Sequence, residues 1–252
     1  MSKTIIKDHP EEIVRVGAEI VRKAAGYAVA HRGRFTMALS GGTTPRPMHR
    51  LLAEDPYRSD IPWRHTHIFW VDERLVPADH PDSNLGLARK DLLDHVPLPA
   101  ANIHPMPTEN TPAQGALEYR RQLGEFFKPA PGRLPALDLI CLGVGSDGHV
   151  ASLFPGPPAD DAGDAWVISV RGGSPDIGRL TLTFPVLNSA GQLFFLVSGK
   201  NKAAIVKTIL EEPSAGLPAQ HVQPYSRNLI WLLDRAAASL LTERKPSENR
   251  EQ

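Results

Sequence analysis

Short, mostly apolar runs alternate along the chain with longer segments whose apolar residues repeat at helical spacing. The apolar runs are FTMAL (35–39), HIFWV (67–71), LDLICL (137–142), LFFLV (193–197) and LIWLL (229–233). Strands that are apolar on both faces are typical of parallel sheets, because their crossover helices cover both sides. The sequence therefore predicts an α/β fold: a doubly wound, mostly parallel sheet flanked by helices on both faces, in a three-layer, Rossmann-like arrangement.

Helices and two weaker strands are predicted between these runs. Asp8 followed by Pro10 indicates a helix start, and Ile13, Val21 and Ala28 then share one face. Further helices are predicted at 83–94, from 111, at 201–211 and at 235–241. The helix from 111 is expected to bury Ala116, Leu117, Leu123, Phe126 and Phe127. The weaker strands are predicted at 166–170 and 180–184.

The length of 252 residues suits one large domain or two small ones, and no linker divides the chain. We therefore expect a single domain over residues 1–241. The last eleven residues, 242–252, are TERKPSENREQ, which has no apolar content and predicts a disordered polar tail.

Composition excludes several classes of protein. The 28 basic and 28 acidic residues balance, which argues against a nucleic acid or an acidic membrane as partner. No secretory signal and no membrane-length apolar stretch is found, so a cytoplasmic location is expected. The single cysteine, Cys141, lies within an apolar run and is predicted to be a core residue. We expect a monomer or a weak homodimer.

Four polar clusters each follow directly after a predicted strand. They are Ser40–Pro45, Asp72–Arg74, Gly143–His149 and Ser198–Lys202. The carboxyl ends of parallel strands lie on one edge of a sheet, where ligands bind at the reversal of strand order. We therefore expect the four clusters to form a single site.

The cluster Ser40–Pro45, SGGTTP, is typical of an anion-binding turn. The backbone amides of Gly41 and Gly42 can surround an anion, and the hydroxyl groups of Thr43 and Thr44 can complete the shell. A plain strand-to-helix turn explains the motif equally well. The Lys-Ser/Thr ending of a nucleotide P-loop is missing, which disfavours ATP or GTP hydrolysis.

The run Gly143–Gly148 matches the pattern G-x-G-x-x-G of dinucleotide-binding proteins. Two features weaken this alternative. Pro155 and the prolines that follow it leave too little room for a crossover helix. The predicted strand at 166–170 is also followed by no acid that could bind a ribose hydroxyl.

The sequence offers one pair for proton transfer and several cations. Asp147 and His149 are separated by one glycine, and a carboxylate can fix the tautomer of a histidine that acts as a base. Arg74 can bind a carboxylate or phosphate, or stabilise an oxyanion, although a structural ion pair with its acidic neighbours is an alternative. Arg179 and Lys202 are further candidates for an anion. His65 and His67 have no third ligand nearby, so no metal site is expected.

Taken together, these motifs resemble the family that includes 6-phosphogluconolactonase and glucosamine-6-phosphate isomerase/deaminase. The resemblance runs from about Ile5 to Leu241, and its most specific part is LDLICLGVGSDGHVASLFPG at 137–156. The supporting segments are ALSGGTTP (38–45), VDERLVP (71–77), DSN (82–84), RLTLTFPVLN (179–188), SGKNKA (198–203) and WLLDRAA (231–237).

The resemblance implies the hydrolysis of 6-phospho-D-glucono-1,5-lactone to 6-phospho-D-gluconate in the oxidative pentose phosphate pathway, without metal or organic cofactor. It implies that His149 is the general base for water, that Asp147 positions His149, and that Arg74 meets the lactone or its developing charge. The residues implied to bind the substrate and its phosphate are Ser40, Gly41, Gly42, Thr43, Thr44, Asp72, Arg179 and Lys202.

Two alternatives stay open. The deaminase branch carries Phe-Asn-Glu-Pro after the shared Asp-Gly-His, whereas residues 152–155 here read SLFP and lack that acid. A non-catalytic sugar-phosphate sensor would need neither Asp147 nor His149. The chain departs from the lactonase pattern at Tyr225–Asn228, where lactonases commonly have a glycine, so the local turn is in doubt.

Overall fold

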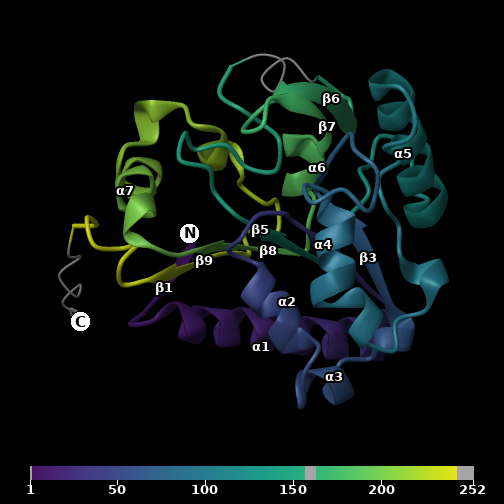
Figure 1. Ribbon diagram of the computed structural model, residues 1–252, viewed down its shortest axis with the longest axis horizontal. Helices are drawn as coiled ribbons and strands as arrows, with labels where there is room; N and C mark the ends of the chain where they lie inside the picture. Colours follow the sequence, from purple (N-terminus) through teal and green to yellow (C-terminus); the bar gives the residue numbers. More distant parts are fainter. Residues whose placement is uncertain (1, 157–162, 243–252) are drawn as a thin grey trace, which may run out of the picture.

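A computed structural model describes residues 2–156 and 163–242, which form a parallel sheet between layers of helices (Figure 1). The six-stranded sheet has the order β1-β9-β8-β5-β2-β3, and every neighbouring pair is parallel. Its strands are β1 (Lys3–Lys7), β2 (Phe35–Leu39), β3 (Thr66–Trp70), β5 (Leu139–Leu142), β8 (Gln192–Val197) and β9 (Leu229–Asp234). The predicted α/β fold with a mostly parallel sheet is confirmed.

Helices cover both faces of this sheet. The longest helix, α1 (Pro10–Arg32), packs along β1, β2, β8 and β9 and contacts α2 (Arg46–Leu52) on the same side (Figure 1). Helix α7 lies on the opposite side of the sheet from α1 in the same view. The remaining helices are α3 (Tyr57–Asp60), α4 (Asn84–Asp91), α5 (Pro112–Phe127), α6 (Phe184–Asn188) and α7 (Ala203–Glu211).

A second, antiparallel sheet is built from β4 (Asp72–Arg74), β7 (Ile177–Leu182) and β6 (Val167–Gly172), in that order. The two weaker strands expected from the sequence are therefore present, but they pair with each other and not with the parallel sheet. The reason is their short connection at 173–176, because only antiparallel neighbours can be joined by so few residues. This small sheet carries Arg74 and Arg179 into the site.

Several predicted boundaries are confirmed, two details are wrong and one strand was missed. Ser83 caps α4, since its hydroxyl accepts a hydrogen bond from the Gly86 amide at 3.1 Å. Leu117 is 65% exposed and does not face the core. Residues 235–241 form turns and no helix; the Asp234 carboxylate accepts a hydrogen bond from the Ala237 amide at 2.7 Å and ends the strand in a turn. Strand β1 was not predicted, because its mostly exposed residues lack the apolar pattern.

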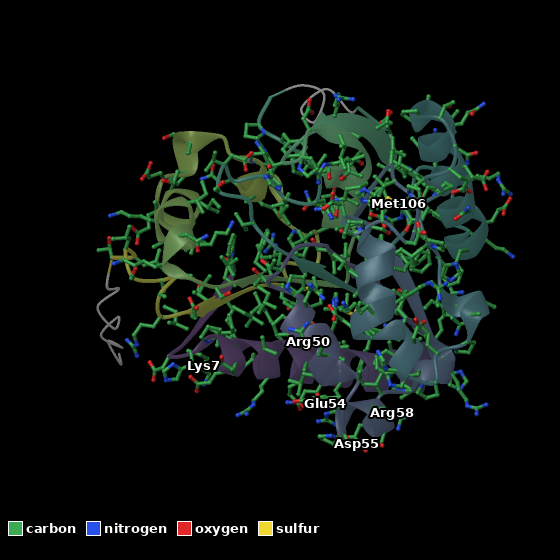
Figure 2. All side chains as sticks on the ribbon, in the orientation of Figure 1. Lys7, Arg50, Glu54, Asp55, Arg58 and Met106 are labelled. Atoms are coloured by element: carbon green, nitrogen blue, oxygen red, sulfur yellow. The ribbon has the colours of Figure 1, made fainter. Side chains whose placement is uncertain are left out.

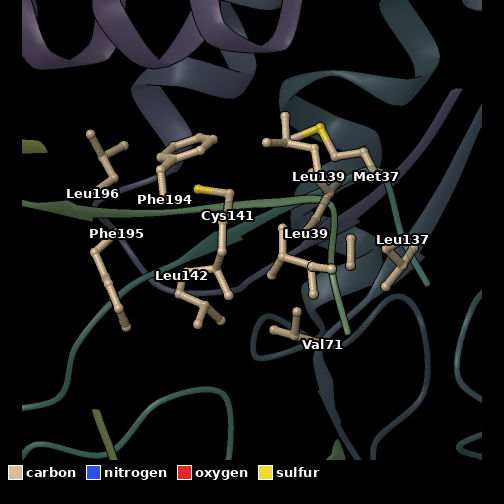
Figure 3. Close-up of a cluster of buried hydrophobic side chains, with 14 of the residues drawn as sticks. Met37, Leu39, Val71, Leu137, Leu139, Cys141, Leu142, Phe194, Phe195 and Leu196 are labelled. Carbon is tan, nitrogen blue, oxygen red and sulfur yellow. The ribbon is translucent and has the colours of Figure 1, made fainter. Parts of the chain in front are cut away.

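The core lies between the parallel sheet and its helices (Figure 3). Met37, Leu139, Cys141 and Phe194 come from neighbouring strands and are all at most 2% exposed. Burial raises the pKa of the Cys141 thiol, which disfavours the reactive thiolate. The prediction that Cys141 is a core residue is confirmed.

Charged side chains, including Arg50, Glu54 and Arg58, project on the side of α2 and α3 (Figure 2). None of the helices among the described residues has both the length and the apolar character needed to span a membrane. The cytoplasmic location stays a prediction, and the predicted tail lies outside the described residues except for Thr242.

Candidate active site

The four polar clusters follow β2, β3, β5 and β8, and therefore lie on the carboxyl edge of one parallel sheet. β2 and β5 are neighbours in the sheet. From β2 the chain continues to β3 toward one edge of the sheet, and from β5 it continues to β8 toward the other edge. The sheet therefore has its topological switch point between these two strands, which is where open α/β sheets bind ligands.

A cleft of about 230 Å³ opens at this switch point. Its lining residues are Ser40, Gly41, Gly42, Thr43, Thr44, Pro45, Asp72, Arg74, Gly143, Val144, Gly145, His149, Ala151, Arg179 and Lys202. Every predicted site residue is in this set except Asp147, which lies next to His149. A larger hollow of about 550 Å³ shares the wall formed by Thr43, Thr44 and Lys202 but lacks the His–Asp pair.

The loop after β5 places Asp147 and His149 in direct contact. His149 Nδ1 lies 2.6 Å from Asp147 Oδ1, and the His149 amide donates to the same oxygen at 3.1 Å. The pair needs space from Gly145, where an added Cβ would lie 2.0 Å from His149 Nδ1. Gly148 has φ +83°, a left-handed conformation that favours glycine and turns the loop sharply. Since Nδ1 is engaged by the carboxylate, Nε2 is left as the basic nitrogen.

Charges around the pair keep the carboxylate ionised. Burial acts to raise the pKa of Asp147, but hydrogen bonds and charge from His149 outweigh it and lower that pKa below its usual value. Lys202 lies on the same side of the cleft and donates from Nζ to the Val144 carbonyl at 2.8 Å. Burial lowers the pKa of Lys202, and the Asp147 carboxylate partly opposes this.

Arg74 enters the cleft from β4 and is held by the start of α4. Its Nη1 donates to the Asp82 carbonyl at 2.8 Å and to Asn84 Oδ1 at 2.6 Å. Its Nε is buried and has no hydrogen-bond partner among the described residues. A buried donor without an acceptor costs free energy. Because Nε is out of contact with solvent, a ligand in the cleft would meet another part of the guanidinium group.

Glu73 holds the backbone around Arg74 and Asn84 in place. Its carboxylate accepts hydrogen bonds from the amides of Arg74 (2.7 Å), Asn84 (2.8 Å) and Leu85 (2.7 Å). Burial raises the pKa of Glu73, although these amides lower it in part. Glu73 thereby joins the end of β4 to the beginning of α4 and fixes the backbone from which the Arg74 side chain projects.

Arg179 is the cross-strand partner of Arg74 in the pairing of β4 with β7. It is 4% exposed, donates from Nε to the Gly172 carbonyl at 2.9 Å and lies over the ring of Phe154. Burial and the Arg74 charge lower the pKa of Arg179, while Asp72 acts in the opposite direction. Two neighbouring cations therefore line the cleft.

The SGGTT loop also lines the cleft. Gly42 has φ +92°, and an added Cβ at Gly41 would lie 1.9 Å from Asn84 Oδ1. Within residues 2–156 and 163–242, the amides of Gly41, Gly42 and Thr43 donate no backbone hydrogen bond. Free amides beside Lys202 are suited to an anion.

Two residues of the site were missed by sequence reasoning. Asn84 belongs to the segment DSN (82–84) but was given no role in the site, yet its Nδ2 donates to the Asp72 carbonyl at 2.8 Å. Ser152 donates to Asp72 Oδ2 at 2.6 Å across 80 residues of sequence. The available signal was that each lies within a segment that resembles the family, Ser152 in 137–156 and Asn84 in 82–84. Lys200, which belongs to the cluster Ser198–Lys202, is exposed and does not line the cleft.

The histidines considered as metal ligands do not form a ligand cluster. His65 lies in a 3₁₀ turn, and His67 Nδ1 lies 3.1 Å from His104 Nε2 beside Phe126. Over the described ranges, no group of three or more His, Cys, Asp or Glu side chains is placed to hold a metal ion.

The fold and the cleft define an α/β protein with a His–Asp pair and a set of cations around a space for one small anionic ligand. The family model for glucosamine-6-phosphate isomerases/6-phosphogluconolactonase matches residues 8–231. The chain therefore belongs to this enzyme family, as the sequence motifs predicted.

Individual relatives agree with this assignment. A 6-phosphogluconolactonase from Synechocystis is 46% identical over 218 residues, covering 85% of this chain and 88% of that protein. One from Nostoc is 41% identical and covers 96% of this chain and all of that protein. The solved structure of 6-phosphogluconolactonase from Trypanosoma cruzi is 26% identical, with a TM-score of 0.86 and coverage of 96% of this chain and 98% of that chain.

Proposed function

We propose that this protein is a 6-phosphogluconolactonase, which hydrolyses 6-phospho-D-glucono-1,5-lactone to 6-phospho-D-gluconate in the oxidative pentose phosphate pathway. The observation that carries the proposal is the shared cleft: His149, Arg74 and the anion-binding groups all line one volume of about 230 Å³, and Asp147 holds His149 from outside this lining. Relatives named for this activity match nearly the whole chain, which supports the same assignment.

In this mechanism His149 Nε2 takes a proton from water as the water oxygen attacks the lactone carbonyl carbon. Asp147 holds Nδ1, so the ring keeps the right tautomer and its positive charge is stabilised as it forms. The tetrahedral intermediate then expels the ring oxygen, which takes the proton back from His149 as the hydroxyl group of the product. The new carboxylic acid loses its proton to solvent.

Arg74 stabilises the oxygen that becomes negative. Its side chain lines the cleft, so its positive charge can stabilise the carbonyl oxygen as negative charge develops there. Side chains thereby supply both the base and the oxyanion stabiliser, and we propose that no metal takes part.

The phosphate is held by Ser40–Thr44, Arg179 and Lys202. Dianion binding at one end of the cleft orients the sugar ring toward His149, which converts binding into positioning of the reacting carbonyl. Asp72 is the carboxylate among the residues that line the cleft, and it is suited to accept hydrogen bonds from the sugar hydroxyl groups. Its negative charge also balances the neighbouring cations.

The test is proton release from freshly prepared 6-phosphogluconolactone in weak buffer that contains EDTA. We expect clear acceleration over spontaneous hydrolysis, a loss of about 10²- to 10⁴-fold in His149→Ala, and unchanged activity in His31→Ala, which alters an exposed histidine on α1. Tight phosphosugar binding without turnover would support the sensor, and ammonia release from glucosamine 6-phosphate would support the deaminase. Either result in place of lactone hydrolysis overturns the proposal.

A further inference from the structure

Ser152 lies on a tight turn directly after the proposed catalytic histidine and is completely buried. The Leu153 amide donates to the Val150 carbonyl at 2.8 Å, and Ala151 between them has φ +50°. A positive φ is unfavourable for alanine, so the surrounding structure holds this turn in place. The turn directs the Ser152 side chain inward, toward the end of β3.

The hydroxyl group of Ser152 reaches a carboxylate that lines the cleft. It donates to Asp72 Oδ2 at 2.6 Å, while the amide of Ser152 donates to Thr181 Oγ1 on β7 at 3.2 Å. The side chain of Asn84 is the other neighbour of the Asp72 carboxylate, and its Nδ2 lies farther away, at 3.4 Å from Oδ1. Among the described residues, Ser152 therefore makes the shortest side-chain hydrogen bond to the Asp72 carboxylate.

Asp72 is 3% exposed and lies among charged groups. A buried carboxylate requires donors that hold its charge in place, and a short hydrogen bond to an ionised group also fixes its geometry. With Oδ2 engaged by Ser152, Oδ1 is the oxygen available to a sugar hydroxyl group. The same bond ties the turn that follows His149 to the strand that leads to Arg74.

We propose that Ser152 is a positioning residue, which orients the Asp72 carboxylate toward the sugar hydroxyl groups of the substrate and fixes the His149 loop against it. The inference rests on the proposed function, because Asp72 acts in it as a substrate-binding group. A purely structural hydroxyl would stabilise the fold without changing KM or kcat.

The experiment is a double-mutant cycle in which Ser152→Ala and Asp72→Asn are made singly and together. We expect Ser152→Ala to lower kcat/KM by about 10- to 100-fold, mainly through KM. In the Asp72→Asn background the same change is expected to cost less than about 3-fold, since coupled residues are not additive. Ser152→Cys keeps the size with a weaker donor, and we expect an intermediate loss.

Thr183→Val is the matched control. Thr183 is also fully buried, and its hydroxyl donates to the Ala165 carbonyl at 2.6 Å, at the end of β7 remote from Arg179. We expect it to lower the unfolding temperature with no change in KM or kcat. If Ser152→Ala does the same, or if its loss is equal in both backgrounds, the inference is wrong.

Measuring the binding of the product separates the test of the proposed lactonase function from the test of the role of Ser152. The dissociation constants of 6-phosphogluconate for the same four proteins are measured by calorimetry. Product binding without lactone hydrolysis in the wild type overturns the proposed function alone, and the cycle in Kd still tests the coupling of Ser152 to Asp72. If the wild type neither binds the product nor hydrolyses the lactone, both proposals are overturned. Should Ser152→Ala fail to fold, Ser152→Cys carries the cycle.

Discussion

Arg74 on β4 and Arg179 on β7 are cross-strand partners, so two guanidinium groups project side by side into one cleft. Like charges directly opposite each other destabilise a sheet. Burial is the largest cause that lowers the pKa of Arg179, and the Arg74 charge adds to it, while Asp72, Asp82 and Glu73 offset part of the effect. The arrangement is therefore costly for the empty protein and favourable once an anion is bound.

This relationship predicts how ligand binding changes stability. 6-Phosphogluconate should raise the unfolding temperature of the wild type, because a ligand that binds only the folded state stabilises it. Arg179→Met should lose most of that rise and about 100-fold in kcat/KM, since it removes a buried charged donor. Thermal unfolding over a ligand series and steady-state kinetics measure both effects.

Arg171→Met is the control for Arg179→Met. Arg171 lies on the adjacent strand β6, but its side chain is 71% exposed and pairs with Asp176. We expect wild-type kinetics and a wild-type response to the ligand. An undiminished rise in unfolding temperature for Arg179→Met would show that Arg179 does not bind the anion.

The second prediction concerns Asp147 and the tautomer of His149. Asp147→Asn keeps the size of the side chain but removes the charge that stabilises an imidazolium ring and selects its tautomer. We expect kcat to fall by about 10²- to 10⁴-fold with KM nearly unchanged, because Asp147 is outside the lining of the cleft. A variant whose KM rises while kcat is unaffected would contradict the assigned role.

Gly145 provides a test of geometry. An alanine Cβ there would lie 2.0 Å from His149 Nδ1 and 2.6 Å from Asp147 Oδ1, so the pair has to separate. We expect Gly145→Ala to lower kcat by about 100-fold, since catalysis is sensitive to displacements of about 1 Å. The loop carries little of the core, and the unfolding temperature should change little.

Gly26→Ala is the matched control for this glycine substitution. Gly26 lies on the exposed side of α1 with no atom within 4 Å of its added Cβ. We expect full activity and a gain of about 0.5–1 kcal/mol in the free energy of unfolding, because alanine is the better helix former. Full activity in Gly145→Ala would mean that the His149–Asp147 contact is not required.

The part of the site that the sequence predicts is the part encoded locally. Asp147 and His149 are two residues apart, and the SGGTT loop follows a strand whose burial is visible as an apolar run. Parallel topology then brings these loops to one edge without further information.

The contacts that the sequence could not predict join residues far apart in the chain. Ser152 meets Asp72 across 80 residues, and the pairing of Arg74 with Arg179 depends on the register of an antiparallel sheet. A strand pattern gives no register with a distant partner, because every shift by two residues keeps the same faces. The position of β4 beside β7 was equally invisible, since β4 has only three residues.

His49 is a buried titratable group outside the cleft, on α2 directly after the SGGTT loop. It is 4% exposed, and its Nε2 has no hydrogen-bond partner among the described residues. Burial lowers its pKa to about 4; Asp91 acts against this, and the charges of Arg46 and Arg50 add to it. The folded protein therefore keeps this histidine neutral under conditions in which the unfolded chain protonates it.

The pH dependence follows from this difference. The ordinary pKa of histidine is about 6.5, whereas the pKa of His49 in the folded protein is about 4. Between these two pH values the unfolded chain binds a proton at His49 and the folded protein does not. The free energy of unfolding therefore falls as the pH falls through this range. Full stability is expected above this range, and the loss from His49 approaches about 3 kcal/mol at its lower end. His49→Met should reduce the slope of stability against pH and, at pH 7.5, raise stability by about 1 kcal/mol because the unpaired Nε2 is gone.

Urea unfolding of the wild type and His49→Met at pH 7.5, 5.5 and 4.5 measures this difference. Because His104 also has a pKa lowered to about 4, the wild type minus variant difference isolates the part due to His49, and parallel curves would show that His49 contributes nothing.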